Sequence, residues 1–347
     1  MNLMKLSQPN SARIINTARV LSALRGSENL SKAELARILT LNKVSTGEIV
    51  DSLLERGLVR ETGKLESSNG RRATSLQLVD DSAYVLAVHY GLAYTQTALC
   101  TLTGNVLKIE RLPSSSESHE AFCALVIKSL IRASKLAGMD KVYGVGLSCD
   151  TENISSGRAK ELKEAIEKYL KKEVALSETA GALICAEKAG GVDLSGDDMI
   201  LYLNWGERIE LSIFSRGNVA GTSAGFGQIL VSSEGNLESF CSVGAIRGEE
   251  EAHMKDLWPK VDSKALSMMA KALRTASRVT GSNRVIVGGE GATIDEDHLD
   301  VLNSLCPGMK IEASGLGEKA LLRSAGELAL DHFFYMNSLI DGVKDWI

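Results

Sequence analysis

The sequence lacks the signatures of a membrane or secreted protein. None of its apolar runs approaches the roughly 18 residues that a membrane-spanning helix needs. The first ten residues also lack the long apolar segment of a secretory signal peptide. We therefore expect a cytoplasmic protein that does not contact the membrane. At 347 residues, with 44% hydrophobic and 24% charged residues, the composition is that of a globular chain of about two domains.

Paired metal-binding or redox cysteines are also missing. The six cysteines stand singly, without a C-x-x-C pair, and the five histidines form no H-E-x-x-H motif. These absences argue against a zinc ribbon, a zinc finger, a dithiol redox site and a metalloprotease helix. We expect reduced, buried thiols, with no metal site and no cofactor.

Basic residues are outnumbered by acidic residues overall, but they are in excess near the start of the chain. The whole sequence has 39 Lys and Arg against 44 Asp and Glu, a net charge of −5. Residues 1–80 reverse this balance, with 12 Lys and Arg against 8 Asp and Glu. A basic first part on an acidic remainder is typical of a protein in which one domain meets nucleic acid.

The pattern of residues 14–56 predicts a helix-turn-helix. Apolar residues recur at helical spacing over 14–24, and Gly26 ends that helix. Ser31 and Glu34 have the spacing of a capping box, which starts a short second helix. After a turn of three or four residues, a third helix runs to about Arg56. The residues expected to face inward are Leu35, Ala36, Ile38 and Leu39 from the second helix, and Val44, Ile49, Val50, Leu53 and Leu54 from the third.

The start of the third helix carries candidate DNA contacts. Asn42, Lys43, Ser45 and Thr46 are short polar or basic side chains that can reach base edges and phosphates. In a helix-turn-helix, the first residues of this helix enter the major groove. We therefore predict that these four residues bind DNA.

A β-hairpin follows the three helices. Residues 58–62 and 74–78 have strand character, and Asn69-Gly70 between them is a hairpin signal. The connecting loop is a wing that carries Lys64, Arg71 and Arg72, which can bind phosphates or enter a minor groove. The alternative is a winged helix that makes only protein contacts, which the basic wing disfavours.

Beyond residue 80 the sequence alternates between strands and helices. A strand–turn–strand–turn–strand meander over 84–110 recurs over 199–219, which suggests a duplicated α/β architecture. Helices are predicted near 118–137, 158–171, 178–189, 262–280 and 318–338.

Specific motifs then resemble a known family. The carrying stretches are "SKAELARILTLNKVSTGEIVDSLLERGLV", "GRRATSLQL", "YVLAVHYGLAYTQTALCTLTGNVL", "YGVGLS", "VIVGGEGA" and "LGEKALLRSAGELAL". In this order they resemble repressors of the ROK family, of the xylose- or N-acetylglucosamine-repressor type. The resemblance implies a winged helix-turn-helix over 1–80 and an actin-like, sugar-kinase-type (ribonuclease H-like) domain over 81–347. That domain would have two lobes with a ligand cleft between them, and its C-terminal helix would return to the first lobe.

The chain departs from the family's kinases at their phosphoryl-transfer motifs. The family's D-I-G-G-T turn corresponds to residues 89–93, "HYGLA", and its G-T-G-I-G turn to residues 206–210, "GERIE". Side chains, two of them acidic, stand where backbone N–H groups would hold phosphates. Thr179 takes the place of the catalytic Asp, and a threonine cannot act as a general base at neutral pH. We therefore predict a protein that is not an enzyme.

The family's zinc element is absent as well. Gly225 and Gln228 replace its Glu and His, and residues 232–238 contain no cysteine. The resemblance places Glu238 at the family's sugar-contacting Glu. With Glu178, Thr179 and Gln228, it forms the polar set expected to bind an effector.

These observations predict a DNA-binding regulator, a repressor of a carbohydrate-related operon, with a non-catalytic ROK domain that binds a small polar effector such as a sugar. We expect a homodimer or homotetramer on double-stranded DNA, at a palindromic operator. One alternative is a regulator with a vestigial cleft that responds to no ligand or to a non-sugar metabolite. A weaker alternative is a sugar kinase with a fused DNA-binding domain.

Overall fold

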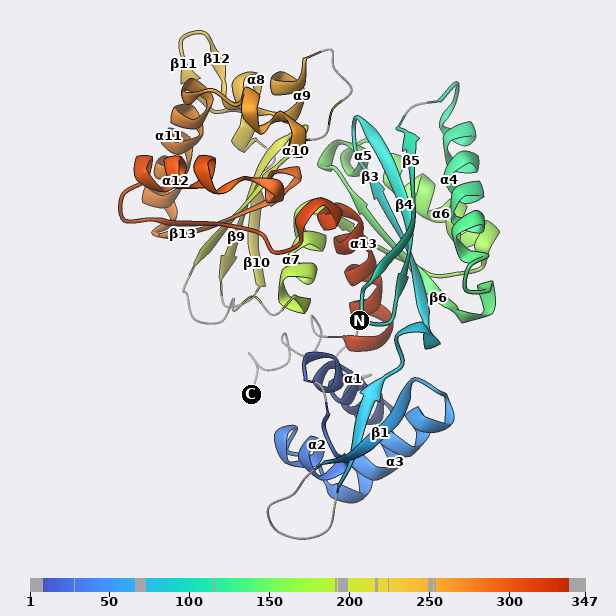
Figure 1. Ribbon diagram of the computed structural model, residues 1–347. Helices are drawn as coiled ribbons and strands as arrows, with labels where there is room; N and C mark the ends of the chain where they lie inside the picture. Colours follow the sequence, from blue (N-terminus) through green and yellow to red (C-terminus); the bar gives the residue numbers. More distant parts are fainter. Residues whose placement is uncertain are drawn as a thin grey trace.

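A computed structural model describes residues 9–27, 29–65, 73–114, 116–190, 192, 199–215, 218–223, 225–248, 252 and 254–336. Three helices and a hairpin form a small part at one end, which we call the head (residues 9–79). The rest, which we call the body (residues 80–336), has two lobes that lie side by side above the head in Figure 1. No helix in the described part of the chain combines the length and the hydropathy of a membrane span.

The head has the predicted order of elements. Its helices are α1 (Pro9–Gly26), α2 (Lys32–Ile38) and α3 (Lys43–Glu55), and its antiparallel strands are β1 (Val59–Leu65) and β2 (Ala73–Leu78). The capping box is present, since the Ser31 side chain accepts from the Glu34 N–H and the Glu34 carboxylate accepts from the Ser31 N–H. Leu35, Ile49 and Leu53 are buried where the three helices meet.

Two residues predicted to face the core of the head do not. Ile38 is 53% exposed and Val44 is 68% exposed. Val44 lies two residues before the buried Thr46 in the first turn of α3, about 200° around the helix and therefore on its outer face. Ile38 ends a helix of seven residues, whose buried positions are Leu35 and Ala36. The predictions for these two side chains are therefore wrong, although the helices that carry them are correct.

The body contains two five-stranded sheets of matching design. In each, an antiparallel meander is extended by two parallel strands, in the orders β5-β4-β3-β6-β7 and β10-β9-β8-β13-β14. This duplication confirms the architecture expected from the repeated meanders. The strands are β3 (Tyr84–Tyr90), β4 (Tyr94–Thr101), β5 (Val106–Pro113), β6 (Val142–Cys149), β7 (Val174–Glu178), β8 (Ile200–Trp205), β9 (Ile209–Ser215), β10 (Asn218–Ser223), β13 (Arg284–Gly289) and β14 (Lys310–Ala313), with a separate hairpin of β11 (Leu230–Ser232) and β12 (Gly235–Asn236).

Helices cover both sheets and join the two lobes. The last helix, α13, packs against β3 and β6 of the first lobe and against α7 (Figure 1). Trp205 and Trp258 are core residues of the second lobe, packed edge to face with their ring centroids 5.4 Å apart. The helices are α4 (His119–Ser134), α5 (Thr151–Ser155), α6 (Arg158–Leu170), α7 (Thr179–Ala189), α8 (Leu237–Cys241), α9 (Val243–Arg247), α10 (Met254–Leu257), α11 (Ser263–Thr280), α12 (Glu296–Leu305) and α13 (Ala320–Leu330), which continues into a π-helical turn, η8 (Asp331–Tyr335).

The head is seated on the first lobe through a shared apolar core. One hydrophobic cluster runs from α1 and α3 through β3 and β4 to α13 and η8. At its edge, Arg25 forms a two-pronged ion pair with Glu327 of α13 and donates to the Thr103 carbonyl at 2.6 Å. The Arg25 guanidinium also lies 4.7 Å from the centre of the Tyr335 ring.

This ion pair is buried, with side-chain exposures of 11% for Arg25 and 2% for Glu327. Burial alone would lower the pKa of Arg25, but the hydrogen bond and negative charge of Glu327 outweigh burial and raise that pKa. Gly104, at a φ of +93°, makes room for the pair, because a Cβ there would collide with both charged groups. The pair therefore ties α1 of the head to the last helix of the body.

Candidate functional site

The first turn of α3 presents polar and basic groups to solvent. Asn42 is the N-cap, and its side-chain oxygen accepts from the Val44 N–H at 2.8 Å. This cap leaves the amide NH2 of Asn42 available as a donor. Lys43 and Ser45 are exposed beside it. Three of the four residues predicted on this helix therefore form one accessible patch at its N-terminus.

Thr46 is the exception and corrects the prediction. Its side chain is fully buried, and its hydroxyl donates to the Asn42 carbonyl at 2.9 Å. A hydroxyl in that position cannot reach a base edge. Thr46 instead holds the first turn of α3 against the head, while the exposed Val44 offers an apolar contact on the outside.

The hairpin after α3 has the predicted wing arrangement. Strands β1 and β2 pair from Val59 opposite Leu78 to Leu65 opposite Ala73. Lys64 lies in β1 opposite Thr74, next to the connecting loop. Arg71 and Arg72 of that loop lie outside the described residues, so their DNA contacts remain a prediction.

In the cleft between the lobes, the turn at residues 89–93, which we call the first phosphate-type turn, is hydrogen-bonded to a carboxylate of the chain itself. The Leu92 N–H of this turn donates to the Asp150 carboxylate at 2.9 Å. The other oxygen of Asp150 accepts from the Thr179 hydroxyl at 3.2 Å. Burial raises the pKa of Asp150 to about 6 despite these two hydrogen bonds. A phosphate at this turn would therefore be close to the Asp150 carboxyl group, which already accepts the hydrogen bond of the Leu92 N–H.

The second phosphate-type turn is closed by ion pairs. Arg208 extends from the turn between β8 and β9 and pairs with Glu152 of the first lobe at 2.5 Å. The same guanidinium lies 3.3 Å from Glu238 of the second lobe. Beside it, Glu207 pairs with Arg247 at 2.5 Å. Arg208 thus links both lobes across the place where a nucleotide phosphate would lie.

Little space is left between the two turns. The cavity that they line, with His89, Tyr94 and Glu290 among its walls, has a volume of about 30 Å³. On the same measure one water needs about 10–15 Å³, so this space holds about two waters. A neighbouring cavity of about 190 Å³ shares the Tyr94, Glu290 and Leu321 walls. Burial lowers the pKa of His89 to about 4 and raises those of Glu210 and Glu290 to about 7. The cavity between the two turns is thus small and has several carboxyl groups around it.

The four predicted effector residues are only partly brought together. The Gln228 side-chain amide donates to the Glu238 carboxylate, and the Asn236 side chain donates to the side-chain amide oxygen of Gln228 at 2.8 Å. Glu238 is connected through Arg208 to the cavity that Thr179 lines. Glu178 is half-buried at the start of α7 and is not among the residues that line this cavity.

The family's zinc does not fit the residues of this chain. The Gln228 amide, at the position of the family's histidine, is engaged with Glu238 and Asn236. Across the described part of the chain, no three His, Cys, Asp or Glu side chains are grouped to hold a metal ion. Amide and hydroxyl groups are in any case poor zinc ligands.

Two residues that organise the cleft were not singled out from the sequence. Asp150 follows the strand β6, and Arg208 replaces a small residue of the second phosphate-type turn. A charged residue directly after a buried strand was the available signal for Asp150. The partners of Arg208 come from residues 56 before and 30 after it, and no local pattern predicts such a contact.

The fold defines a class of protein: a winged helix-turn-helix head on an actin-like, two-lobed body. The curated proteins most similar in sequence include the "Xylose repressor" of Caldicellulosiruptor bescii, 24% identical over 301 residues, which covers 76% of this chain and 75% of the relative. The "Xylose repressor" of Bacillus subtilis strain 168 is 23% identical and covers 74% and 71%. No family model matches the chain.

Solved structures agree on the fold. A ROK family transcriptional regulator, described as a homologue of the E. coli MLC protein, matches with a TM-score of 0.68 at 18% identity, covering 96% of this chain and 99% of that one. A ROK family glucokinase from Streptomyces griseus matches with a TM-score of 0.57 at 18% identity, over 71% of this chain and 99% of that one. The resemblance to ROK repressors is confirmed, and the regulator is matched over the head as well as the body.

Proposed function

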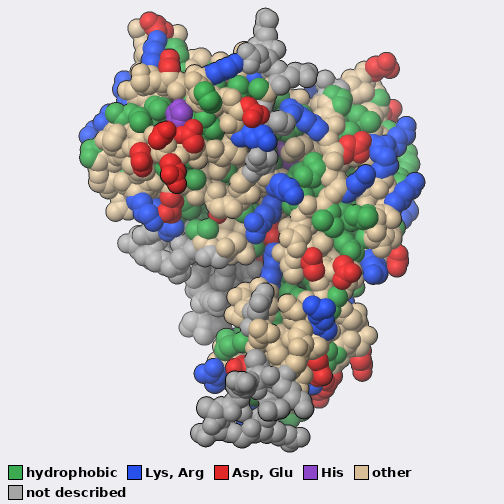
Figure 2. Space-filling view, viewed as in Figure 1, with side chains coloured by type: hydrophobic (Ala, Val, Ile, Leu, Met, Phe, Trp, Pro, Cys, Tyr) green, Lys and Arg blue, Asp and Glu red, His purple; other side chains and the backbone are tan. Residues whose placement is uncertain are grey.

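We propose that this protein is a DNA-binding transcriptional repressor of a carbohydrate-related operon. The observation that carries the proposal is the exposed first turn of α3, where Asn42, Lys43 and Ser45 form a patch that can enter a major groove. The sequence relatives named as xylose repressors support it. Figure 2 shows acidic side chains gathered over α12 of the body, whose first turn carries Glu296 and Asp297, and this part of the surface would repel phosphates.

Two copies of the chain would present two heads to an operator with two-fold symmetry. We propose a homodimer, or a homotetramer made of two such dimers, bound to palindromic double-stranded DNA. Half-sites one helical turn apart would then reflect the distance between the two α3 helices.

The wing provides the test of DNA binding. A duplex recovered by selection from a random 30-base-pair pool should bind wild-type protein with an affinity that falls steeply as salt rises. The double variant Arg71→Ala/Arg72→Ala should bind more weakly and lower the salt slope by about 2, since each phosphate contact contributes about 1. Arg132→Ala, on the first lobe, is the matched control and should bind as wild type. If no duplex is enriched, the proposed function is wrong. If the double variant has the same salt slope as wild type, only the predicted DNA contacts of the wing are wrong.

We also propose that the body is not a kinase. The small cleft cavity, the use of the Leu92 N–H by Asp150 and the ion pairs of Arg208 all oppose binding of a nucleotide. ATP with Mg²⁺ should therefore leave the melting temperature unchanged, and a coupled assay with xylose or glucose should detect no ADP formation. ADP released in proportion to added sugar would contradict this.

The effector, if it is a sugar, must compete with Arg208. We propose that the hydroxyls of a sugar bind Glu238 and Gln228, which at present bind Arg208 and each other. Replacing Arg208 by alanine frees the Glu238 carboxylate and removes one link between the lobes. Because Arg208 links the two lobes, a sugar that displaces it from Glu238 couples sugar binding to lobe movement. DNA affinity then changes only if the sugar favours one arrangement of the lobes.

Xylose is the first sugar to test, because the relatives are named xylose repressors. Wild-type protein should release the selected duplex as xylose is added, and Arg208→Ala should do so at a severalfold lower xylose concentration. Arg132→Ala, which removes an ion pair on the first lobe's surface, should match wild type. If xylose and other sugars leave DNA affinity unchanged in all three proteins, the cleft is vestigial.

A further inference from the structure

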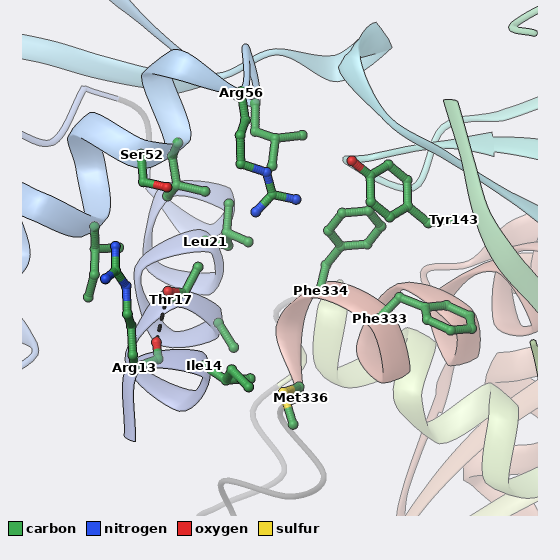
Figure 3. A pocket seen from close by; sticks show the side chains of 14 residues that line it. Arg13, Ile14, Thr17, Leu21, Ser52, Arg56, Tyr143, Phe333, Phe334 and Met336 are labelled. Atoms are coloured by element: carbon green, nitrogen blue, oxygen red, sulfur yellow. Dashed lines mark hydrogen bonds between the residues drawn. The ribbon is translucent and has the colours of Figure 1, made fainter. Parts of the chain in front are cut away.

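A second cavity lies between the head and the body, away from the cleft. It has a volume of about 390 Å³ and is walled by α1, the end of α3, Tyr143 of β6 and the π-helical turn η8. In Figure 3 the rings of Tyr143 and Phe334 face α1 across this space, and Met336 lies at its lower edge. This volume is within the range of small-molecule sites, about 300–1,000 Å³.

The lining of this cavity combines apolar walls with charge of one sign. Ile14, Leu21 and Phe334 contribute apolar surface, and the charged residues among those that line it are Arg13 and Arg56. Figure 3 shows the Arg56 side chain extending from the end of α3 into the space between α1 and Phe334. Within the part of the chain that the structure describes, no Asp or Glu lies within 4.0 Å of either guanidinium, as an ion pair would require. Thr17 and Ser52 add hydroxyl groups to the same walls.

We propose that this cavity binds a small organic anion, a carboxylate on an apolar body. Arg56, whose exposed side chain extends into the cavity, binds the carboxylate, because a guanidinium matches the geometry of a carboxylate and keeps its charge. Arg13, which is also exposed and lies on the other side of α1 in Figure 3, adds positive charge at the rim. The aromatic and aliphatic walls cover the apolar body, whose burial provides most of the binding free energy.

DNA phosphate is a poorer occupant of this cavity. Arg56 is the C-cap of α3, at the end opposite Asn42. A helix of 13 residues is roughly 20 Å long, so Arg56 is separated by that length from the turn proposed to enter the groove. The cavity also faces the body, through Tyr143 and Phe334.

A ligand in this cavity touches both the head and the body. Its head contacts come from α1 and α3, and its body contacts from β6 and η8. Binding therefore stabilises the observed seating of the head, whatever occupies the cleft between the lobes. This inference does not depend on the proposed function, since it concerns an anion and requires no DNA.

The test uses the full chain with 8-anilinonaphthalene-1-sulfonate, a fluorescent aromatic anion, as the probe. Sodium octanoate should displace the probe from wild-type protein, and the uncharged octanol should be at least tenfold less effective. The double variant Arg13→Gln/Arg56→Gln should bind the probe at least tenfold more weakly. Arg60→Gln removes an exposed head arginine outside the cavity and should stay within twofold of wild type. Ser52→Phe, which fills the cavity without changing charge, should also weaken binding.

Three results would overturn the inference. Equal probe affinity in wild type and the double variant places the anion elsewhere on the protein. Equal displacement by octanol and octanoate assigns no role to the two arginines. Absence of probe binding to a wild-type chain with a normal melting curve shows that the cavity is filled by another part of the chain.

Discussion

Replacing Arg25 by alanine should lower the free energy of unfolding by about 3–5 kcal/mol. The substitution leaves the Glu327 carboxylate, which is 2% exposed, without its cation in a low-dielectric environment. It also removes the donor to the Thr103 carbonyl and the cation that lies over the Tyr335 ring. Urea unfolding followed by circular dichroism measures the loss.

Two comparisons separate the buried ion pair from ordinary truncation of a side chain. Arg60→Ala removes an exposed head arginine that bonds to Gln77 and should cost no more than about 0.5 kcal/mol. The double variant Arg25→Met/Glu327→Met replaces the pair by apolar groups of similar length and should recover most of the loss. A loss below about 1 kcal/mol for Arg25→Ala would mean that water reaches Glu327 in solution.

Replacing Asn42 by alanine should have two separable effects. The N-cap is lost, which lowers stability by about 0.5–2 kcal/mol, because the Val44 N–H loses its side-chain acceptor. The amide donor is lost as well, which relaxes discrimination at one base by about 1–3 kcal/mol if Asn42 contacts a base edge. Competition between the selected duplex and its single-base variants measures the second effect.

Asn42→Ser distinguishes the two roles of this residue. Serine is an equally good N-cap but lacks the amide NH2, so this variant should keep wild-type stability and still lose discrimination. Thr46→Ser is a useful control, because the buried hydroxyl that bonds to the Asn42 carbonyl is kept and only a methyl group is removed. If Asn42→Ser recognises every base as wild type does, Asn42 serves only as a helix cap.

Most of the fold could be predicted from the sequence, because its signals are local. The capping box at Ser31 and the repeated meanders each depend on residues close together in the chain. Inward-facing side chains were harder to predict. An apolar side chain at position 44 suggests a core residue, but in the first turn of α3 the buried position is that of Thr46.

The cleft could be predicted only in part. Substitution of the phosphate-type turns was visible in the sequence, and the structure shows what fills them. The contacts of Arg208 with Glu152 and Glu238, and of Asp150 with Leu92, join segments from 30 to 58 residues apart. The buried position of Thr46 is likewise not indicated by its own neighbours in the sequence. Contacts of this kind follow from the tertiary fold, and residue type alone does not specify them.

The shared core of head and body limits how this protein can be taken apart or recombined. The hydrophobic cluster of α1 and α3 continues into α13 and η8. The head therefore cannot be exchanged as an independent domain by cutting the chain near residue 80. A chimera that joins this head to another regulator would expose the apolar surface of α1 and α3 to water and leave Arg25 without Glu327. Such a chimera would also need α13, although Glu327 of that helix lies 302 residues after Arg25 in the chain.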